Sequence, residues 1–179
     1  MLYAFGFERV GVMVSDLYFL DPTPNLNQEG AERGVRLELR ALERASLKGS
    51  IYSAQPIGVD RPLWRVDLLE SVASAPGSFD RTHHHPTFNG WEPCKRNFVP
   101  ELSADPLGWL GQRLSDIGQV LDDGGEGRAV LGPNDAADIR AAAQEIVEAT
   151  SKLLRRVHAG DLAAPPPDVV LQDARIGWL

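Results

Sequence analysis

The spacing of apolar residues changes near Pro100, and this change constrains the fold more than any other feature of the chain. Before Pro100, apolar and polar residues alternate in several segments, as in strands that bury one face. After it, apolar residues recur every three or four positions, as in amphipathic helices. The sequence therefore predicts an α+β domain. We expect an antiparallel, twisted sheet, open or partly closed, in roughly the first 100 residues, with two helices packed on it.

Four segments before Pro100 are typical of strands, and they cover residues 10–20, 34–42, 50–57 and 63–70. The second and the fourth alternate most clearly, so each should bury one face. A turn is expected at 58–62, where glycine, aspartate and proline gather. The polar row of the second segment is most simply a solvated sheet face, and it consists of Arg36, Glu38 and Arg40.

Two helices are expected after Pro100. Asp105 can cap the first helix, which would open with Pro106 and end in the glycine-rich segment 122–127. The second helix should begin near Asn134 and stop at Gly160. The first helix should bury Leu107, Leu110, Leu114, Ile117 and Leu121. The second should bury Ile139, Ala143, Ile146, Thr150, Leu153 and Val157.

Residues 1–160 are expected to form a single domain, β-rich over 1–100 and helical over 104–160, because a chain of 179 residues can bury one core. Residues 161–179 form a proline-rich tail that is extended but ends in the apolar residues IGWL. Such an ending should dock on its own domain or on another subunit, since exposing it to water is unfavourable. A homo-oligomer formed through the sheet or this tail is the expected assembly.

The charge and the single cysteine limit the class of protein. A net charge of −7 argues against a non-specific nucleic-acid coat, which needs a basic footprint, but leaves a local basic patch open. One cysteine cannot form an internal disulfide, and the first residues lack the features of a signal peptide. No run approaches 18 apolar residues, so we expect a cytoplasmic protein without a membrane span.

The segment 80–98 concentrates reactive side chains. It reads DRTHHHPTFNGWEPCKRNF and holds three of the four histidines and the only cysteine. Asn89 and Gly90 predict a hairpin turn. With a four-residue turn over 88–91, residues whose numbers sum to 179 would lie opposite each other. Strand alternation then places six side chains on one face: His83, His85, Thr87, Glu92, Cys94 and Arg96.

This face could hold a metal. His83 and His85, with Cys94 opposite His85, would suit Zn²⁺ or Fe²⁺ as a nitrogen–sulfur site. Glu92 could be a further ligand or a general base, and Arg96 could hold an anionic group of a substrate. Without a metal, a histidine and Glu92 could act as an acid–base pair. The alternative is a hairpin that only packs.

Two hypotheses about function follow. The first is a small hydrolase or nuclease-like enzyme acting on a phosphate or carboxylate substrate, with His83, His85, Glu92 and Arg96 as catalytic residues. The second is a non-catalytic interaction or structural protein that forms a homo-oligomer or binds a partner. The metal content of the purified protein separates them.

Overall fold

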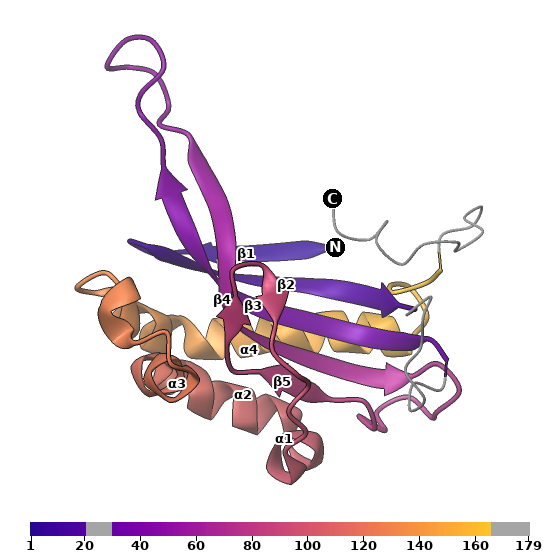
Figure 1. The fold of residues 1–179 in the computed structure, drawn as a ribbon. Helices are drawn as coiled ribbons and strands as arrows, with labels where there is room; N and C mark the ends of the chain where they lie inside the picture. Colours follow the sequence, from indigo (N-terminus) through magenta and orange to yellow (C-terminus); the bar gives the residue numbers. More distant parts are fainter. Residues whose placement is uncertain (21–29, 166–179) are drawn as a thin grey trace.

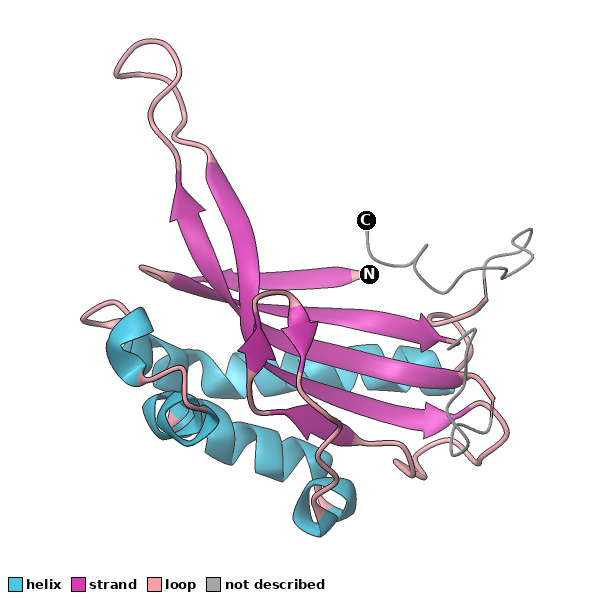
Figure 2. Cartoon of the chain, viewed as in Figure 1, coloured by secondary structure: helices cyan, strands magenta, loops and turns pink. Residues whose placement is uncertain are grey.

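The computed structural model describes residues 1–20 and 30–165, and in them an antiparallel sheet lies against a layer of helices (Figures 1 and 2). The sheet has five strands in the order β1-β2-β3-β4-β5, so each strand pairs with its neighbour in sequence. A separate two-stranded hairpin, β6-β7, follows β5. The strands are β1 Leu2–Gly6, β2 Val10–Phe19, β3 Glu32–Arg44, β4 Ile57–Ser71, β5 His83–His85, β6 Phe88–Asn89 and β7 Glu92–Pro93.

The helices lie on one face of this sheet (Figure 2). The longest, α4, packs against β2 and β3, and α2 lies beside α4. The short helix α1 leads into α2, and α3 follows α2 and contacts β4. Their bounds are α1 Pro100–Ala104, α2 Pro106–Ser115, α3 Ile117–Gly124 and α4 Asp135–His158, with a 3₁₀ turn at Arg128–Val130. No helix within the described residues is both long and apolar enough to cross a membrane.

The predicted α+β layout, sheet first and helices after, is confirmed, but the helical part is divided more finely than expected. Asp105 caps α2 by accepting a hydrogen bond from the Gly108 N–H at 3.0 Å. The single helix predicted from Pro106 breaks at Asp116, where the backbone leaves helical geometry and α3 begins. The apolar stripe continues across the break, because Leu110, Leu114, Ile117 and Leu121 are all buried.

Two expectations for the first hundred residues are wrong. Residues 50–57 were expected to form a strand, but they lie almost wholly in the loop at the tip of the β3–β4 hairpin. The turn expected at 58–62 is part of β4, which begins at Ile57. The two strands continue past a register shift near Arg40 and project from the body as a ribbon (Figure 1). The sequence does not predict this part of β4 because it contains Gly58 and Pro62, and both residue types are more usual in turns.

Alternation in β3 and β4 builds the core. Val35, Leu37 and Leu39 face the helices and are fully buried, and Trp64, Val66 and Leu68 of β4 pair with them on the same face. The intervening residues of both strands therefore point to the opposite face. The expected docking of the tail concerns residues of which 166–179 lie outside the described part of the chain.

A substitution at Gly34 tests how closely β3 and β4 pack against each other. A Cβ atom at this position would lie 2.0 Å from the Leu68 carbonyl oxygen. We therefore predict that Gly34→Ala lowers the free energy of unfolding by about 2 kcal/mol or more, because backbone atoms cannot move aside cheaply. Gly6→Ala, on edge strand β1 with nothing within 4 Å of the added carbon, should change it by about 0.5 kcal/mol or less. Urea denaturation measures both, and equal losses would contradict this account.

Candidate metal centre

The sheet face opposite the helices carries charged side chains that are buried. Asp67 is 1% exposed and Arg65 is 2% exposed. The expectation of a solvated face for Arg36, Glu38 and Arg40 is therefore wrong: Glu38 is buried, and the two arginines are half-buried and ion-paired. Side chains of neighbouring strands form ion pairs with one another here, and this pairing compensates for the loss of hydration when the charges are buried.

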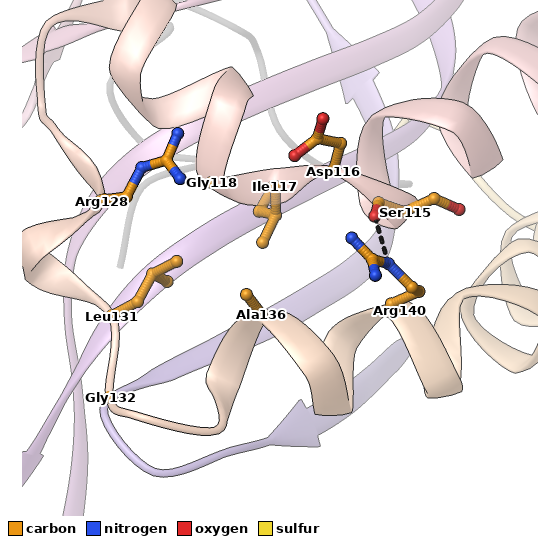
Figure 3. Close-up of a pocket in the computed structure, with 9 residues that line it drawn as sticks. All are labelled: Ser115, Asp116, Ile117, Gly118, Arg128, Leu131, Gly132, Ala136 and Arg140. Carbon is orange, nitrogen blue, oxygen red and sulfur yellow. Dashed lines mark hydrogen bonds between the residues drawn. The ribbon is translucent and has the colours of Figure 1, made fainter.

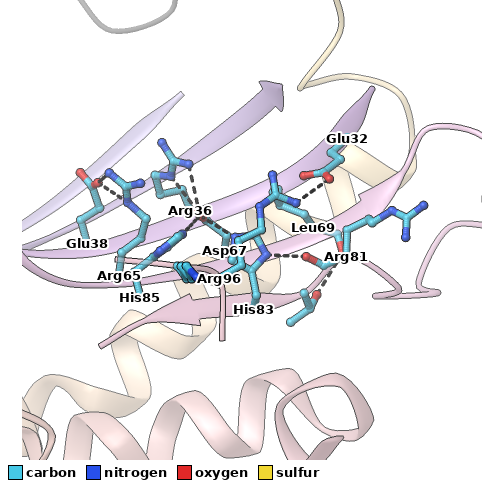
Figure 4. Close-up of polar contacts among 12 residues, drawn as sticks. Glu32, Arg36, Glu38, Arg65, Asp67, Leu69, Arg81, His83, His85 and Arg96 are labelled. Atoms are coloured by element: carbon cyan, nitrogen blue, oxygen red, sulfur yellow. Dashed lines mark hydrogen bonds and ion pairs between the residues drawn. The ribbon is translucent and has the colours of Figure 1, made fainter. Parts of the chain in front are cut away.

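Strand register arranges these side chains in rows across the sheet (Figure 4). Asp67 of β4 lies between Arg36 of β3 and His83 of β5. In the next row, Arg65 of β4 lies between Glu38 and His85. Because every second residue of a strand shares a face, both rows point to the same side. His83, His85 and Asp67 are thus brought together from two strands.

Three potential metal ligands converge at this place, and we call them the triad: Asp67, His83 and His85. One atom from each, a carboxylate oxygen or an imidazole nitrogen, lies within 4.8 Å of the other two, and all three residues are buried. The Nε2 atoms of His83 and His85 lie 3.4 and 3.6 Å from Asp67 Oδ2. Within the described residues, no other group of this kind is found.

Backbone carbonyls fix both imidazoles. His83 Nδ1 lies 2.7 Å from the Arg81 carbonyl oxygen, and His85 Nδ1 lies 2.7 Å from that of Cys94. A carbonyl can only accept, so each Nδ1 carries the proton. In a neutral imidazole, Nε2 then presents its lone pair, and both lone pairs face a carboxylate oxygen. This arrangement requires protons or a cation between the three atoms, and it is how metal-ligating histidines are usually held.

The distances within the triad leave room for a shared cation. A charge-assisted hydrogen bond from an imidazolium would be about 2.7–2.9 Å long, whereas the observed separations are 3.4 and 3.6 Å. Ligands bound at about 2.0–2.1 Å to a tetrahedral ion lie about 3.3–3.4 Å apart. Two imidazoles and one carboxylate also form a ligand set that suits Zn²⁺ or Fe²⁺ and leaves positions for water and substrate.

Arg36 keeps Asp67 ionised. Its guanidinium donates from Nε to Oδ1 at 2.6 Å and from Nη2 to Oδ2 at 3.2 Å. Burial alone would raise the pKa of Asp67, but the charge of Arg36 and the contacts with His83 and His85 outweigh burial and hold this pKa well below its usual range. The longer of the two arginine contacts falls on Oδ2, the oxygen that faces both imidazoles.

A cavity of about 720 Å³ lies beside the triad on the same face. Arg65, which pairs with His85 across the β4–β5 ladder, forms part of its wall. Glu38 accepts hydrogen bonds from Arg65 at 2.7 Å and from Arg40 at 3.1 Å. The cavity is lined by Glu38, Arg40, Pro62, Arg65, Trp91, Glu92 and Pro93.

The structure brings some of the expected site residues together and separates others. His83 and His85 lie in the triad. Cys94 contributes its carbonyl oxygen to His85, while its thiol donates to the Lys95 carbonyl at 3.4 Å and is not part of the ligand group. Glu92 is exposed and lines the cavity. Arg96 pairs with the buried Glu32 at 2.7 Å on the same sheet face (Figure 4).

The hairpin register differs from the expected one. Phe88 pairs with Pro93 and Asn89 with Glu92, so the numbers of paired residues sum to 181 and the turn is Gly90 and Trp91. A shift of two residues leaves each side chain on its original face, because the side-chain period of a strand is two. It does change the partners: Cys94 lies opposite Thr87, to which its N–H donates at 3.1 Å, and not opposite His85.

His84 points to the other face, as expected from alternation. Its ring packs against Trp109 with ring centroids 5.3 Å apart. Burial, together with the nearby charge of Arg113, lowers the pKa of His84 to about 4, so this imidazole is neutral near pH 7. It therefore belongs to the helix-facing side of the sheet.

A second pocket lies between α3 and α4, and none of its lining residues belongs to the triad (Figure 3). Its volume is about 250 Å³, and two arginines stand at its edges. Arg140 donates to the Ser115 carbonyl at 2.7 Å, and Arg128 is bonded to Asp122. Because acceptors of the chain itself engage both cations, we assign no ligand to this pocket.

Comparison with known proteins adds no information about the site. No known protein family matches the chain, and neither a characterised protein nor a solved structure is significantly similar to it. The function must therefore be inferred from the geometry of the triad and its surroundings.

Zinc binding tests the triad directly. We predict that the protein binds one equivalent of Zn²⁺ and that His83→Ala, His85→Ala and Asp67→Asn each weaken binding by about tenfold or more, since even residues behind the ligands have effects of this size. The control is His84→Ala, which removes the neighbouring imidazole from the opposite face and should leave binding unchanged. Calorimetric titration measures all four variants. An equal loss in His84→Ala would show that the triad is not the binding site.

The affinity should also depend on pH. A metal needs the Nε2 lone pairs of His83 and His85, so binding displaces any protons held there. We therefore expect the affinity for Zn²⁺ to fall as the pH is lowered from 8 to 5, and proton release to be measurable in buffers of different ionisation enthalpy. Binding that is independent of pH over this range would contradict coordination by imidazole.

Proposed function

We propose that this protein is a small metal-dependent hydrolase that cleaves phosphate esters, with chemistry of the nuclease type. The observation that carries the proposal is the triad: three buried residues in which two imidazole nitrogens lie 3.4 and 3.6 Å from one carboxylate oxygen. Three protein ligands leave a coordination position open, which is typical of catalytic and not of structural sites.

The chain's own residues would hold and orient the metal. His83 and His85 would bind through Nε2, while the carbonyls of Arg81 and Cys94 keep their rings in place. Asp67 would bind through Oδ2, with Arg36 retaining Oδ1. A Zn²⁺ or Fe²⁺ ion so bound supplies a water of lowered pKa as nucleophile and a positive charge for the scissile group.

A partly exposed guanidinium on the face of the triad, that of Arg96, suits an anionic substrate. Arg36 and Arg65 lie in the two rows that contain the triad histidines, and Arg96 extends over the same face (Figure 4). The side chain of Arg96 is 29% exposed, so it can contact solvent or substrate while it pairs with Glu32. A guanidinium in this position would stabilise the negative charge that develops on a phosphoryl group.

Glu92 has a different role in this proposal from the base first considered. It forms no hydrogen bond or ion pair with either triad histidine, and it lines the cavity beside Arg65. A carboxylate in this position would contact the part of the substrate that does not react. We therefore assign the reaction to the triad and Arg96, and assign Glu92 to substrate binding.

A non-catalytic interaction protein is the second candidate, and one observation favours it. The β3–β4 ribbon projects from the body, and its tip exposes Tyr52 by 92% and Ile51 by 81% (Figure 1). Exposed apolar groups at the end of an arm are typical of contact with another subunit or partner. Light scattering of the wild type and of Ile51→Ser/Tyr52→Ser would show whether the arm forms a homo-oligomer.

Phosphodiester hydrolysis tests the first candidate. With bis(4-nitrophenyl) phosphate and one equivalent of Zn²⁺ or Fe²⁺, we predict turnover that falls by about 100-fold in His85→Ala, because the metal is lost. Arg96→Ala should lose about tenfold or more in kcat while still binding metal, because it removes charge stabilisation only. The matched control is Arg140→Ala, an arginine on the helical side, which should keep full activity. A metal-loaded wild type without turnover would reject the hydrolase and favour the interaction protein.

A further inference from the structure

We propose that the 720 Å³ cavity beside the triad binds a guanine base, so that the substrate is a guanine nucleotide. The inference deepens the proposed function and rests on it for the reaction, but the binding itself can be tested separately. It is carried by two side chains of the β6-β7 hairpin, Trp91 and Glu92, and by the position of the cavity relative to the triad.

Trp91 provides an ordered stacking surface. It is 59% exposed, yet the guanidinium carbon of Arg40 lies 5.0 Å from its ring centroid. A cation held against one face of an indole restrains the ring, and the ring also lines the cavity. A large aromatic side chain that is restrained and open to a cavity suits a planar ligand, because stacking on a base is favourable whichever base is present.

Glu92 provides the means of selecting the base. Within the described residues its carboxylate has no hydrogen-bond or ion-pair partner, and it lines the same cavity as Trp91. An ionised carboxylate offers two acceptors side by side. On the Watson–Crick edge, guanine is the base that presents two adjacent N–H donors, N1–H and N2–H, whereas adenine and cytosine each present a single donor group next to an acceptor. A carboxylate therefore prefers guanine.

The charged side chains of the cavity balance one another. Arg40 and Arg65 line it together with Glu38 and Glu92, and Glu38 is bonded to both arginines. The ring of a ligand stacked on Trp91 therefore needs no net charge, and a nucleobase has none.

The cavity also lies at the right place for a nucleotide. Arg65 is two residues from Asp67 on β4 and pairs with His85, so the cavity begins one row from the triad. Residues two apart on one strand are separated by about 6.6–6.8 Å. A base stacked on Trp91 would thus leave its sugar and phosphate on the side of the triad and Arg96.

Nucleotide binding should be measured on the wild-type protein in EDTA, so that neither metal-dependent hydrolysis nor a metal–phosphate bond contributes. Calorimetry with GMP, AMP and CMP should show GMP bound about tenfold more tightly than the other two. Trp91→Ala should weaken GMP binding by about tenfold. Glu92→Gln should remove most of the preference for GMP over AMP, since an amide offers only one acceptor. The controls are Tyr52→Ala and Glu101→Gln, an exposed aromatic residue and an exposed carboxylate elsewhere on the molecule, and neither should change binding.

Several results would overturn the inference. The inference is wrong if GMP does not bind, if the three nucleotides bind with equal affinity, or if Trp91→Ala leaves GMP binding unchanged. These results do not depend on whether the triad binds a metal. Conversely, the metal-loaded wild type could bind GMP selectively and still fail to hydrolyse a phosphodiester. This result would reject the hydrolase and leave the assignment of the cavity standing. The dinucleotide GpA distinguishes the source of the base: tighter binding than GMP indicates the end of a nucleic acid, and equal or weaker binding indicates a free nucleotide.

Discussion

The buried carboxylate of Asp67 is the group on which the polar face of this protein depends. An ionised carboxylate that is 1% exposed would be strongly unfavourable without compensating charge. Arg36 supplies one full charge through two hydrogen bonds. The two imidazoles of His83 and His85 present Nε2 to the same oxygen, and a divalent cation between these atoms would complete the compensation. The triad is therefore the candidate metal site of the polar face.

The fold places apolar side chains and charged side chains on opposite faces of one sheet. Toward the helices, β3 and β4 present fully buried side chains such as Leu37 and Val66, which form the core. Toward the other side, the same strands present the rows that contain Arg36 and Asp67. Because these groups alternate along rigid, paired strands, their spacing is set by the sheet and not by flexible loops. The hairpin β6-β7 then adds the cavity wall.

The sequence predicts the features that depend on residues close together in the chain, and it does not predict those that depend on contacts between distant residues. The alternation of β3 and β4, the cap at Asp105 and the buried face of α4 are local patterns, and the sequence predicts all three correctly. His83 and His85 could be placed on one face by alternation alone. Asp67 could not be added to them, because its partnership with His83 depends on the pairing of β4 with β5 across the intervening residues 72–82. Nothing in the sequence indicates that Arg40 lies against Trp91, because the approach of β3 to the turn of the β6-β7 hairpin depends on the fold.

The position of a bound metal tests the central claim most directly. Anomalous diffraction from crystals grown with Zn²⁺ should show one peak bonded to Asp67 Oδ2 and to Nε2 of His83 and His85, at about 2.0–2.2 Å from each. Arg36 should remain bonded to Oδ1. A peak elsewhere, or none at the triad with one imidazole donating directly to Asp67 at about 2.7–2.9 Å, would contradict the account, because the histidines would then be protonated partners of the carboxylate and not metal ligands.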